Sequence, residues 1–417
     1  MTPTSRWTTA VLTTAVLALA ACSTPGTTPT PSAGPWESSA GPTPSGTPSA
    51  SPRPSPSPTP SASSTPGAAA EGRTDADDPL AGMSLEEKVG QLLVVGAPVA
   101  EGGVHAPTRT AVVDHHVGNV FLHGRSEAGL AATRELVDAY RALAPSSAPP
   151  MLVATDQEGG AVQVLRGAGF SEIPAATRQA TWPRARLERL ATRWGTELAD
   201  AGVDLNLAPV MDLVPAGNQQ ANAPIGYFSR NYGNTARSVV DGATAFSAGM
   251  QSAGVEPVIK HFPGLGRVTE NTDTTASVVD DTITAGSKDV EVFAAGIDAG
   301  ARFVMLSNAV YTRIDPDQQA TFSPAVVAIL RDDLAFDGVV ITDDVSAAAA
   351  VDDVAPADRA VAAVEAGVDL VLASADPSVV PAMADALVER ARADEEFAAQ
   401  VDTAVERVLA AKADLPD

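Results

Sequence analysis

Residues 260–275, KHFPGLGRVTENTDTT, bring together side chains whose types suit ligand binding and proton transfer. Lys260 and His261 close an apolar run, and a Pro-Gly turn separates them from a loop rich in carboxyl and hydroxyl groups. An ammonium, an imidazole and nearby carboxylates are groups that bind polar ligands and exchange protons with them. The plainer alternative is a salt bridge at a strand end beside a packed imidazole.

Polar residues end other apolar runs in the same way. Asp156, Asp212, Asn308 and the adjacent pair Asp343 and Asp344 all stand at or near the end of such a run. A single aspartate after a strand often caps the next helix, so no one of them indicates a site by itself. Five polar strand ends in one chain favour a shared site, provided that the strands are parallel and end on one face.

The apolar runs number eight, and Ala-rich segments with helical spacing separate them, which is typical of parallel strands joined by helices. The runs that we interpret as strands occupy residues 91–96, 118–123, 151–156, 203–212, 257–262, 302–308, 338–344 and 369–375. Segments 186–202 and 358–367 have helical spacing and end in glycine, a common residue at helix ends. Eight such units predict an α/β fold, a single catalytic (β/α)8 TIM barrel with its site at the carboxyl ends of the strands.

The formal net charge of -24 and the single cysteine limit the partners and the means of stabilisation. An acidic surface repels phosphate backbones, so we expect no nucleic-acid partner. One cysteine cannot form an internal disulfide, so packing must stabilise the fold. The histidines show no convincing metal-ligand spacing, and no phosphate-binding loop is present, so we predict neither a metal nor a cofactor.

The first 22 residues have the features of a secretory signal peptide. Leu19-Ala-Ala-Cys22 resembles the lipobox of bacterial lipoproteins, in which the cysteine is acylated; an ordinary Ala-x-Ala cleavage site is the alternative. Residues 23–71 are almost entirely Pro, Ser, Thr, Gly and Ala, which predicts a disordered tether. We therefore expect an exported, extracytoplasmic protein that contacts the cell membrane only through lipid on Cys22, with residues 72–417 as its folded domain.

Five motifs follow one another along the folded part. They are TDQEGGAVQVLRG (155–167), DLNLAPVMDL (204–213), PIGYFSRNYG (224–233), KHFPGLG (260–266) and FDGVVITDDVS (336–346). Over about residues 80–412 the chain resembles glycoside hydrolase family 3, most closely the single-domain bacterial β-N-acetylglucosaminidases that act on cell-wall fragments. The resemblance implies a retaining hydrolase of peptidoglycan-derived glycans that contain N-acetylglucosamine, and we expect a monomer.

The resemblance assigns the nucleophile, the carboxylate that attacks the anomeric carbon, to Asp343. Adjacent strand residues point to opposite sides, so Asp344 is expected to support or cap the site. Lys260 and His261 would hydrogen-bond sugar hydroxyls and place positive potential beside Asp343.

The resemblance also assigns two further sugar-binding residues. Asp156 matches the family aspartate that accepts hydrogen bonds from sugar hydroxyls, and Arg230 matches an arginine that contacts the glycan.

The chain departs from the family where the general acid should lie. Single-domain relatives carry an Asp-Ser-His element after the Pro-Gly turn, and its histidine is the acid/base. Gapless alignment places Asn271, Thr272 and Asp273 at these three positions. Leu265 and Ala161 also replace a histidine and an arginine that are common in the family.

Two outcomes follow from this departure. The chain ends at Asp417, soon after the eighth run, so we expect the acid from the loop, with Asp273 or Glu270 as the proton donor. The alternative is a glycan-binding pseudoenzyme, because general acid catalysis contributes roughly 100- to 10,000-fold. Specificity for β-glucosides stays open as well, since no residue that reads the 2-acetamido group can be identified.

Overall fold

The computed structural model describes residues 79–100 and 102–415. The predicted signal peptide, Cys22 and the tether at 23–71 lie outside these residues and stay predictions. Within the described part, no helix is both long enough and apolar enough to span a bilayer.

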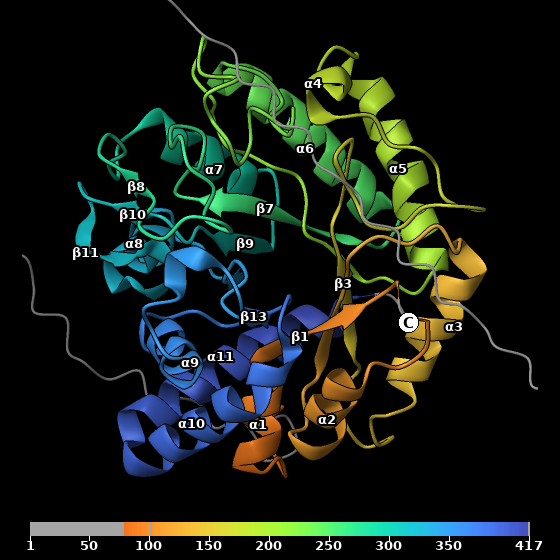
Figure 1. Ribbon diagram of the computed structural model, residues 1–417, viewed down its shortest axis with the longest axis vertical. Coiled ribbons are helices and arrows are strands. Elements are labelled where there is room, and N and C mark those ends of the chain that lie inside the picture. The colour runs from red at the N-terminus through yellow and green to blue at the C-terminus, as the bar shows by residue number, and fades with distance from the viewer. Residues whose placement is uncertain (1–78, 101, 416–417) are drawn as a thin grey trace, which may run out of the picture. The chain divides into compact units, whose positions relative to one another are not determined.

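Eight parallel strands form one sheet in the order β12-β9-β7-β6-β3-β2-β1-β13, with helices around it (Figure 1). Their bounds are β1 Leu93–Pro98, β2 Asn119–His123, β3 Leu152–Thr155, β6 Leu205–Asn206, β7 Glu256–Phe262, β9 Phe303–Leu306, β12 Val339–Ile341 and β13 Val371–Ala373. A parallel bridge between Ile341 and Leu370 brings the two ends of the sheet together. Each predicted run overlaps one of these strands, with boundaries that differ by a few residues, and the predicted (β/α)8 barrel is confirmed.

Helix α1 precedes the first strand, and the other helices alternate with or follow the strands along the chain, as a βα succession requires. Their bounds are α1 Leu85–Gln91, α2 Ala106–Asp114, α3 Leu130–Arg141, α4 Ala176–Gln179, α5 Arg184–Asp200, α6 Ala236–Ser252, α7 Lys288–Asp298, α8 Pro324–Ala328, α9 Pro356–Glu365, α10 Val380–Ala393 and α11 Glu395–Ala413. Short 3-10 or π turns occupy Ala320–Phe322, Ile329–Asp333, Ala349–Val351 and Pro377–Val379.

Two small sheets are built from the loops. One is a hairpin of β4 Gln157–Gly159 and β5 Val162–Gln163. The other consists of β8 Val279–Asp280, β10 Val310–Tyr311 and β11 Asp315–Gln319.

Alternation along each strand divides the core into two layers. Val339 and Ile341 of β12 belong to a cluster inside the barrel, whereas Val340 between them packs outward with the helices. Because side chains of a strand alternate between its faces, the same period of two continues past the strand ends. It therefore determines which polar residues reach the barrel axis.

Helix α11 covers the amino end of the barrel. Val408 and Ala411 of this helix join the cluster inside the barrel. Nζ of Lys412 donates hydrogen bonds to Oε1 of Gln91 (2.7 Å) and to the carbonyl of Gly118 (3.0 Å), which lie just before β1 and β2.

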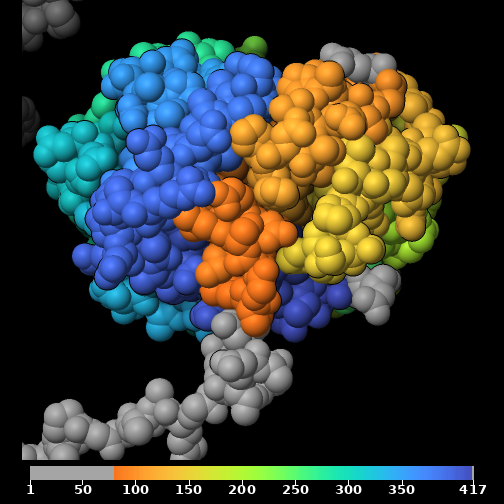
Figure 2. All heavy atoms as spheres, turned by 90° about the horizontal axis from the view of Figure 1, so that it is seen from below, coloured from red at the N-terminus to blue at the C-terminus, as the bar shows by residue number. Residues whose placement is uncertain are grey.

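The beginning and the end of the described chain also meet on the surface. The N-terminal part in orange lies against the C-terminal helices in blue (Figure 2), and Lys88 of α1 pairs with Asp402 of α11 at 2.8 Å. Helix α11 thus fills the amino end of the barrel, and the polar strand ends lie at the opposite, carboxyl end.

Candidate active site

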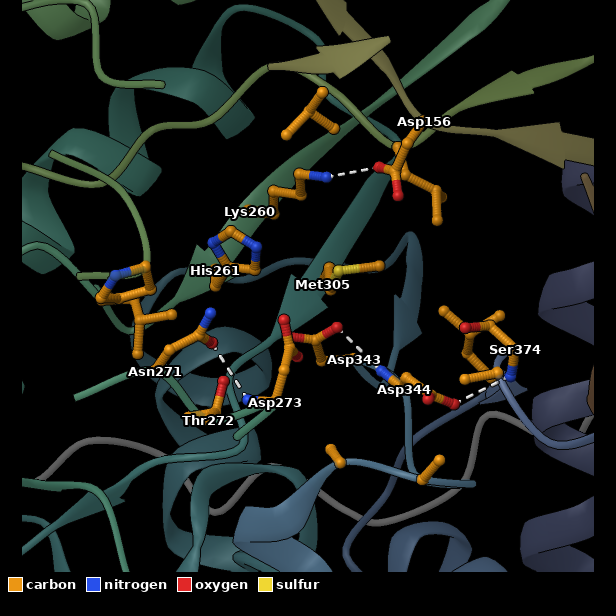
Figure 3. A pocket seen from close by; sticks show the side chains of 18 of the residues that line it. Asp156, Lys260, His261, Asn271, Thr272, Asp273, Met305, Asp343, Asp344 and Ser374 are labelled. Atoms are coloured by element: carbon orange, nitrogen blue, oxygen red, sulfur yellow. Dashed lines mark hydrogen bonds and ion pairs between the residues drawn. The ribbon is translucent and has the colours of Figure 1, made fainter. Parts of the chain in front are cut away.

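A pocket of about 390 Å³ opens at the carboxyl ends of the strands (Figure 3). Its walls come from seven of the eight strand ends and from the loops that follow them. The lining residues are Phe121, Asp156, Val162, Leu207, Pro224, Arg230, Lys260, His261, Leu265, Asn271, Thr272, Asp273, Met305, Asp343, Asp344, Ala347, Ala348, Leu372, Ser374 and Ala375. Pockets of this size bind small molecules, and this one is lined by both charged and apolar groups.

Asp343 lies in the pocket because it continues the inward series of Val339 and Ile341 two residues further along the chain. One of its carboxylate oxygens accepts a hydrogen bond of 2.8 Å from the backbone N–H of Asp344. Burial raises the pKa of Asp343 to about 6, and the nearby Asp273 carboxylate contributes, although His261 and Lys260 oppose the rise.

Asp344 organises the backbone around its neighbour. Its Oδ1 accepts hydrogen bonds from the N–H of Ser346 (3.0 Å), the hydroxyl of Ser346 (2.7 Å) and the N–H of Ser374 (2.8 Å). This is the supporting role expected for Asp344. The side chain of Asn308 donates a hydrogen bond to the carbonyl of Asp344 at 2.8 Å. Asn308 does not line the pocket, so it holds the backbone of Asp344 from outside the pocket wall.

Lys260 is held between two carboxylates. Its buried Nζ lies 2.6 Å from Oδ1 of Asp156 and 2.8 Å from Oε1 of Glu158. Arg230 binds Glu158 through two nitrogens, at 2.7 and 3.0 Å. Although burial favours the neutral acid, Arg230 and Lys260 hold the pKa of Glu158 at about 2. The structure thus brings Asp156, Arg230 and Lys260 together.

Glu158 is a residue that the sequence analysis missed. It lies within the quoted TDQEGG motif, two residues after Asp156. Residues two apart in an extended segment share one side, and Gln157–Gly159 forms strand β4, so the spacing was the available signal.

His261 has a buried partner, Asp212, whose carboxylate also organises the backbone. Nδ1 of His261 lies 2.7 Å from Oδ2 of Asp212, and Oδ1 accepts the N–H groups of His261 (3.2 Å) and Leu265 (2.6 Å). The register between β7 and β9 shifts between Ile259 and Phe262, so strict alternation is interrupted there. Lys260 and His261 therefore both line the pocket.

The loop with the two candidate acids brings only one of them into the pocket. Asp273 lines the pocket, and Figure 3 shows its carboxylate next to that of Asp343. Oδ1 of Asn271 accepts the N–H of Asp273 at 3.0 Å. Glu270 is exposed, accepts the hydroxyl of Thr269 at 2.6 Å and does not line the pocket. The geometry therefore favours Asp273 over Glu270 as the proton donor.

The backbone of this loop is anchored to the segment after Asp343. The carbonyls of Thr272 and Asp273 accept the N–H groups of Ala350 (3.0 Å) and Ala349 (3.3 Å). Among residues 79–100 and 102–415, no group of three or more His, Cys, Asp or Glu side chains is arranged to hold a metal ion. The pocket therefore contains two carboxyl groups, those of Asp343 and Asp273, and a cluster of charged groups that could hydrogen-bond a polar ligand.

Comparisons with known proteins show the family to which the chain belongs. Residues 84–411 match the model of the glycosyl hydrolase family 3 N-terminal domain. The crystal structure of a beta-N-acetylhexosaminidase from Beutenbergia cavernae is 57% identical, with a TM-score of 0.78, and the match covers 79% of this chain and 99% of that chain. A family 3 glycosyl hydrolase from Mycobacterium smegmatis is 30% identical with a TM-score of 0.70, over 81% of this chain and 99% of that one. A beta-hexosaminidase from Stenotrophomonas maltophilia is 34% identical over 290 residues, which are 67% of this chain and 82% of the relative.

Proposed function

The chain belongs to glycoside hydrolase family 3, and we propose that it is a retaining β-N-acetylhexosaminidase that removes N-acetylglucosamine from glycans. The observation that carries this proposal is the Asp343 carboxylate in a sugar-sized pocket beside Asp273 and the hydroxyl-binding groups Asp156, Lys260 and Arg230. A glycosidase of this type needs a carboxylate to attack the anomeric carbon and an acid to protonate the departing oxygen.

Asp343 is the nucleophile in this proposal. The N–H of Asp344 holds one of its oxygens, which leaves the other free to attack the anomeric carbon and form a covalent glycosyl intermediate. Attack requires the ionised carboxylate, and its pKa of about 6 makes it mostly ionised at neutral pH. The positive potential of Lys260 and His261 favours that ionised form.

Asp273 serves both halves of the reaction. In the first half it gives its proton to the leaving-group oxygen as the glycosidic bond breaks. In the second half its carboxylate takes a proton from the water that displaces Asp343 from the sugar.

The charged cluster positions the sugar in the proposed complex. Asp156 is 27% exposed and keeps carboxylate oxygen available for hydroxyl groups, whereas Glu158 is only 5% exposed. Glu158 therefore acts through Lys260 and Arg230, whose donors it aims and whose charge it balances. Hydrogen bonds from charged groups are among the stronger ones, so this cluster suits tight recognition of one sugar.

The alternatives are less well supported. A pseudoenzyme needs no acid beside the nucleophile, yet Asp273 lies in the pocket with Asp343. A β-glucosidase is not favoured, because relatives that match most of the folded part are named as hexosaminidases.

We further propose that the substrate derives from the bacterial cell wall and that lipid on Cys22 anchors the protein outside the membrane. The signal-like first 22 residues, the lipobox-like sequence and the Pro-rich segment support this location. Cys22→Ser should shift the expressed protein from the membrane fraction to the medium. Equal membrane recovery of both forms would contradict the anchor.

The activity can be tested with the full chain, nitrophenyl glycosides, muropeptides and a fluorinated sugar that traps the covalent intermediate. We expect release of N-acetylglucosamine and a trapped adduct on Asp343 by mass spectrometry. Asp343→Ala should abolish the adduct, whereas the control Asp344→Ala should still form one. Release of glucose alone would favour a β-glucosidase, and binding without release would favour a pseudoenzyme.

A further inference from the structure

Two exposed aromatic side chains lie on a turn that contributes to the pocket wall. Tyr227 is 59% exposed and Phe228 is 44% exposed, and no other Phe, Tyr or Trp side chain in the described ranges is classed as exposed. Their rings meet edge to face, with centroids 5.1 Å apart and an angle of 85° between the planes. Pro224 and Arg230, on either side of them in the chain, line the pocket.

The turn is anchored on its N-terminal side by Asn222, which is fully buried. Asn222 accepts hydrogen bonds from the N–H of Gly226 through its side-chain oxygen (2.7 Å) and from the N–H of Tyr227 through its carbonyl (2.9 Å). Its side-chain amide donates to the carbonyls of Leu265 (2.9 Å) and Val268 (2.8 Å). One buried side chain therefore joins the aromatic turn to the loop that leads to Asp273.

The C-terminal side of the turn is anchored by Arg230. Its backbone N–H donates to the carbonyl of the buried Ile225 at 3.1 Å, and its guanidinium forms the ion pair with Glu158. Both ends of the turn are thus tied to buried groups, so the two rings between them are held at the surface. Their exposure leaves apolar area that a ligand could cover.

The pocket leaves only one direction for a longer glycan. Leu207 and Met305 line the pocket and also belong to the apolar cluster that fills the barrel, so the pocket is closed at its base. A volume of about 390 Å³ suits one N-acetylhexosamine, and the next sugar of the chain must then lie outside the mouth.

Resting on the function proposed above, we propose that Tyr227 and Phe228 form a stacking platform for the pyranose ring on the leaving-group side of the scissile bond. A pyranose presents a C–H face that can cover an aromatic ring while its hydroxyls, at the edge, stay hydrated. Net charge does not attract an uncharged sugar, so contact with the two exposed rings is a source of affinity that the acidic chain can still offer there. The substrate class is therefore an oligosaccharide with at least one sugar beyond the bond that is cleaved.

The test compares two substrates of the full chain that differ only in the leaving group. Tri-N-acetylchitotriose carries sugars as its leaving group, and N-acetylglucosaminyl β-fluoride carries a single atom. In the double variant Tyr227→Ala/Phe228→Ala, kcat/KM for the trisaccharide should fall about 5- to 100-fold, the range that loss of one stacking contact produces. The value for the fluoride should stay within about 2-fold, because the fluoride has no ring to stack.

Two controls make the result specific. Tyr227→Phe/Phe228→Tyr keeps both rings and should retain the wild-type preference for the trisaccharide. Val113→Ala removes another exposed apolar side chain, on α2, and should leave kcat/KM unchanged for both substrates.

An unchanged trisaccharide rate, or an equal loss for both substrates, would overturn the platform while leaving the hydrolase intact. A wild-type chain that cleaves neither substrate would instead contradict the proposed function itself. The two exposed rings could instead form a contact between copies of the protein. If the double variant lost self-association but kept its trisaccharide turnover, the platform would also be overturned.

Discussion

Nδ1 of His261 lies 2.7 Å from Oδ2 of Asp212, and the two side chains are 5% and 0% exposed. Asp212 follows β6 and His261 lies in β7, so neighbouring strands supply the pair. A carboxylate on Nδ1 favours the proton on that nitrogen and orients the ring, which leaves the other nitrogen for the ligand. In the proposed complex His261 would bind the sugar, and its direction is set by Asp212, which does not line the pocket.

Asp212→Asn should raise KM about 10-fold or more while kcat changes less, because the ring loses its anionic partner. Steady-state kinetics on an N-acetylglucosaminide would measure this split. Asp280→Asn is the matched control: Asp280 is also buried and accepts backbone N–H groups of Thr282 and Ile283, but it does not line the pocket. A KM change of the same size in the control would assign Asp212 a general structural role.

Asp273→Ala should lower hydrolysis of substrates with poor leaving groups about 100- to 10,000-fold, because such groups need protonation as they depart. Activated aryl glycosides should lose far less in their first step. Glu270→Ala removes the other carboxylate of the same loop and should leave the hydrolysis rates of both substrate types unchanged, since Glu270 does not line the pocket. If both substrate types lost activity equally, Asp273 would be a structural residue.

The ionisation of Asp343 should affect stability as well as activity. Its pKa in the folded state, about 6, is above the ordinary value of 3.8, so the folded protein keeps this proton to higher pH than the unfolded chain. The ionisation of Asp343 therefore lowers the free energy of unfolding as the pH rises from about 3.8 to about 6. Asp343→Asn, which stays neutral, should increase the free energy of unfolding at pH 7.5 by on the order of 2–3 kcal/mol and leave it almost unchanged at pH 3.5.

Denaturant unfolding at the two pH values would measure this difference. Asp344→Asn is the control, because Asp344 accepts three hydrogen bonds and its loss should destabilise the protein at pH 7.5. Destabilisation by Asp343→Asn at pH 7.5 would contradict the raised pKa. The same ionisation predicts that kcat/KM falls as the pH drops below about 6.

Glu158→Gln should destabilise the protein by about 3–5 kcal/mol, because it leaves Lys260 and Arg230 with less compensating charge in a buried place. The pKa of Glu158 is about 2, below its ordinary value of 4.5, so its contribution is fully present above about pH 4.5 and is lost as the pH falls toward 2. The difference between wild type and variant should thus be constant from pH 5 to 8. KM should rise as well.

Glu256→Gln provides the comparison for Glu158. Glu256 pairs with Arg302 at 3.2 Å, away from the pocket, and Arg302 is 31% exposed. A more exposed pair contributes less, so we expect a loss below about 1 kcal/mol and an unchanged KM. If the two variants lost the same free energy of unfolding, Glu158 would contribute no more to stability than a partly exposed ion pair does.

Much of the site could be predicted because a local pattern decides it. Asp343 lies four residues after Val339 and two after Ile341, so the alternation of β12 alone directs its side chain inward. The same period places Lys260 two residues after Val258, which lies inside the barrel. Asp273 could be proposed because it replaces a family histidine in the loop, although alignment alone could not separate it from Glu270.

By itself, the sequence determined the eight strands, their order along the chain and the polar residues at their ends. The hydrophobic pattern that predicts a strand depends only on residues that are close together in the sequence. Only the tertiary structure decided which charges pair, since Lys260 meets Asp156 across 104 residues and His261 meets Asp212 across 49. The turn with Tyr227 and Phe228 gave no sign of its exposure, because apolar residues usually predict burial. Pairing and exposure depend on barrel closure and loop paths, which bring together residues that are far apart in the chain.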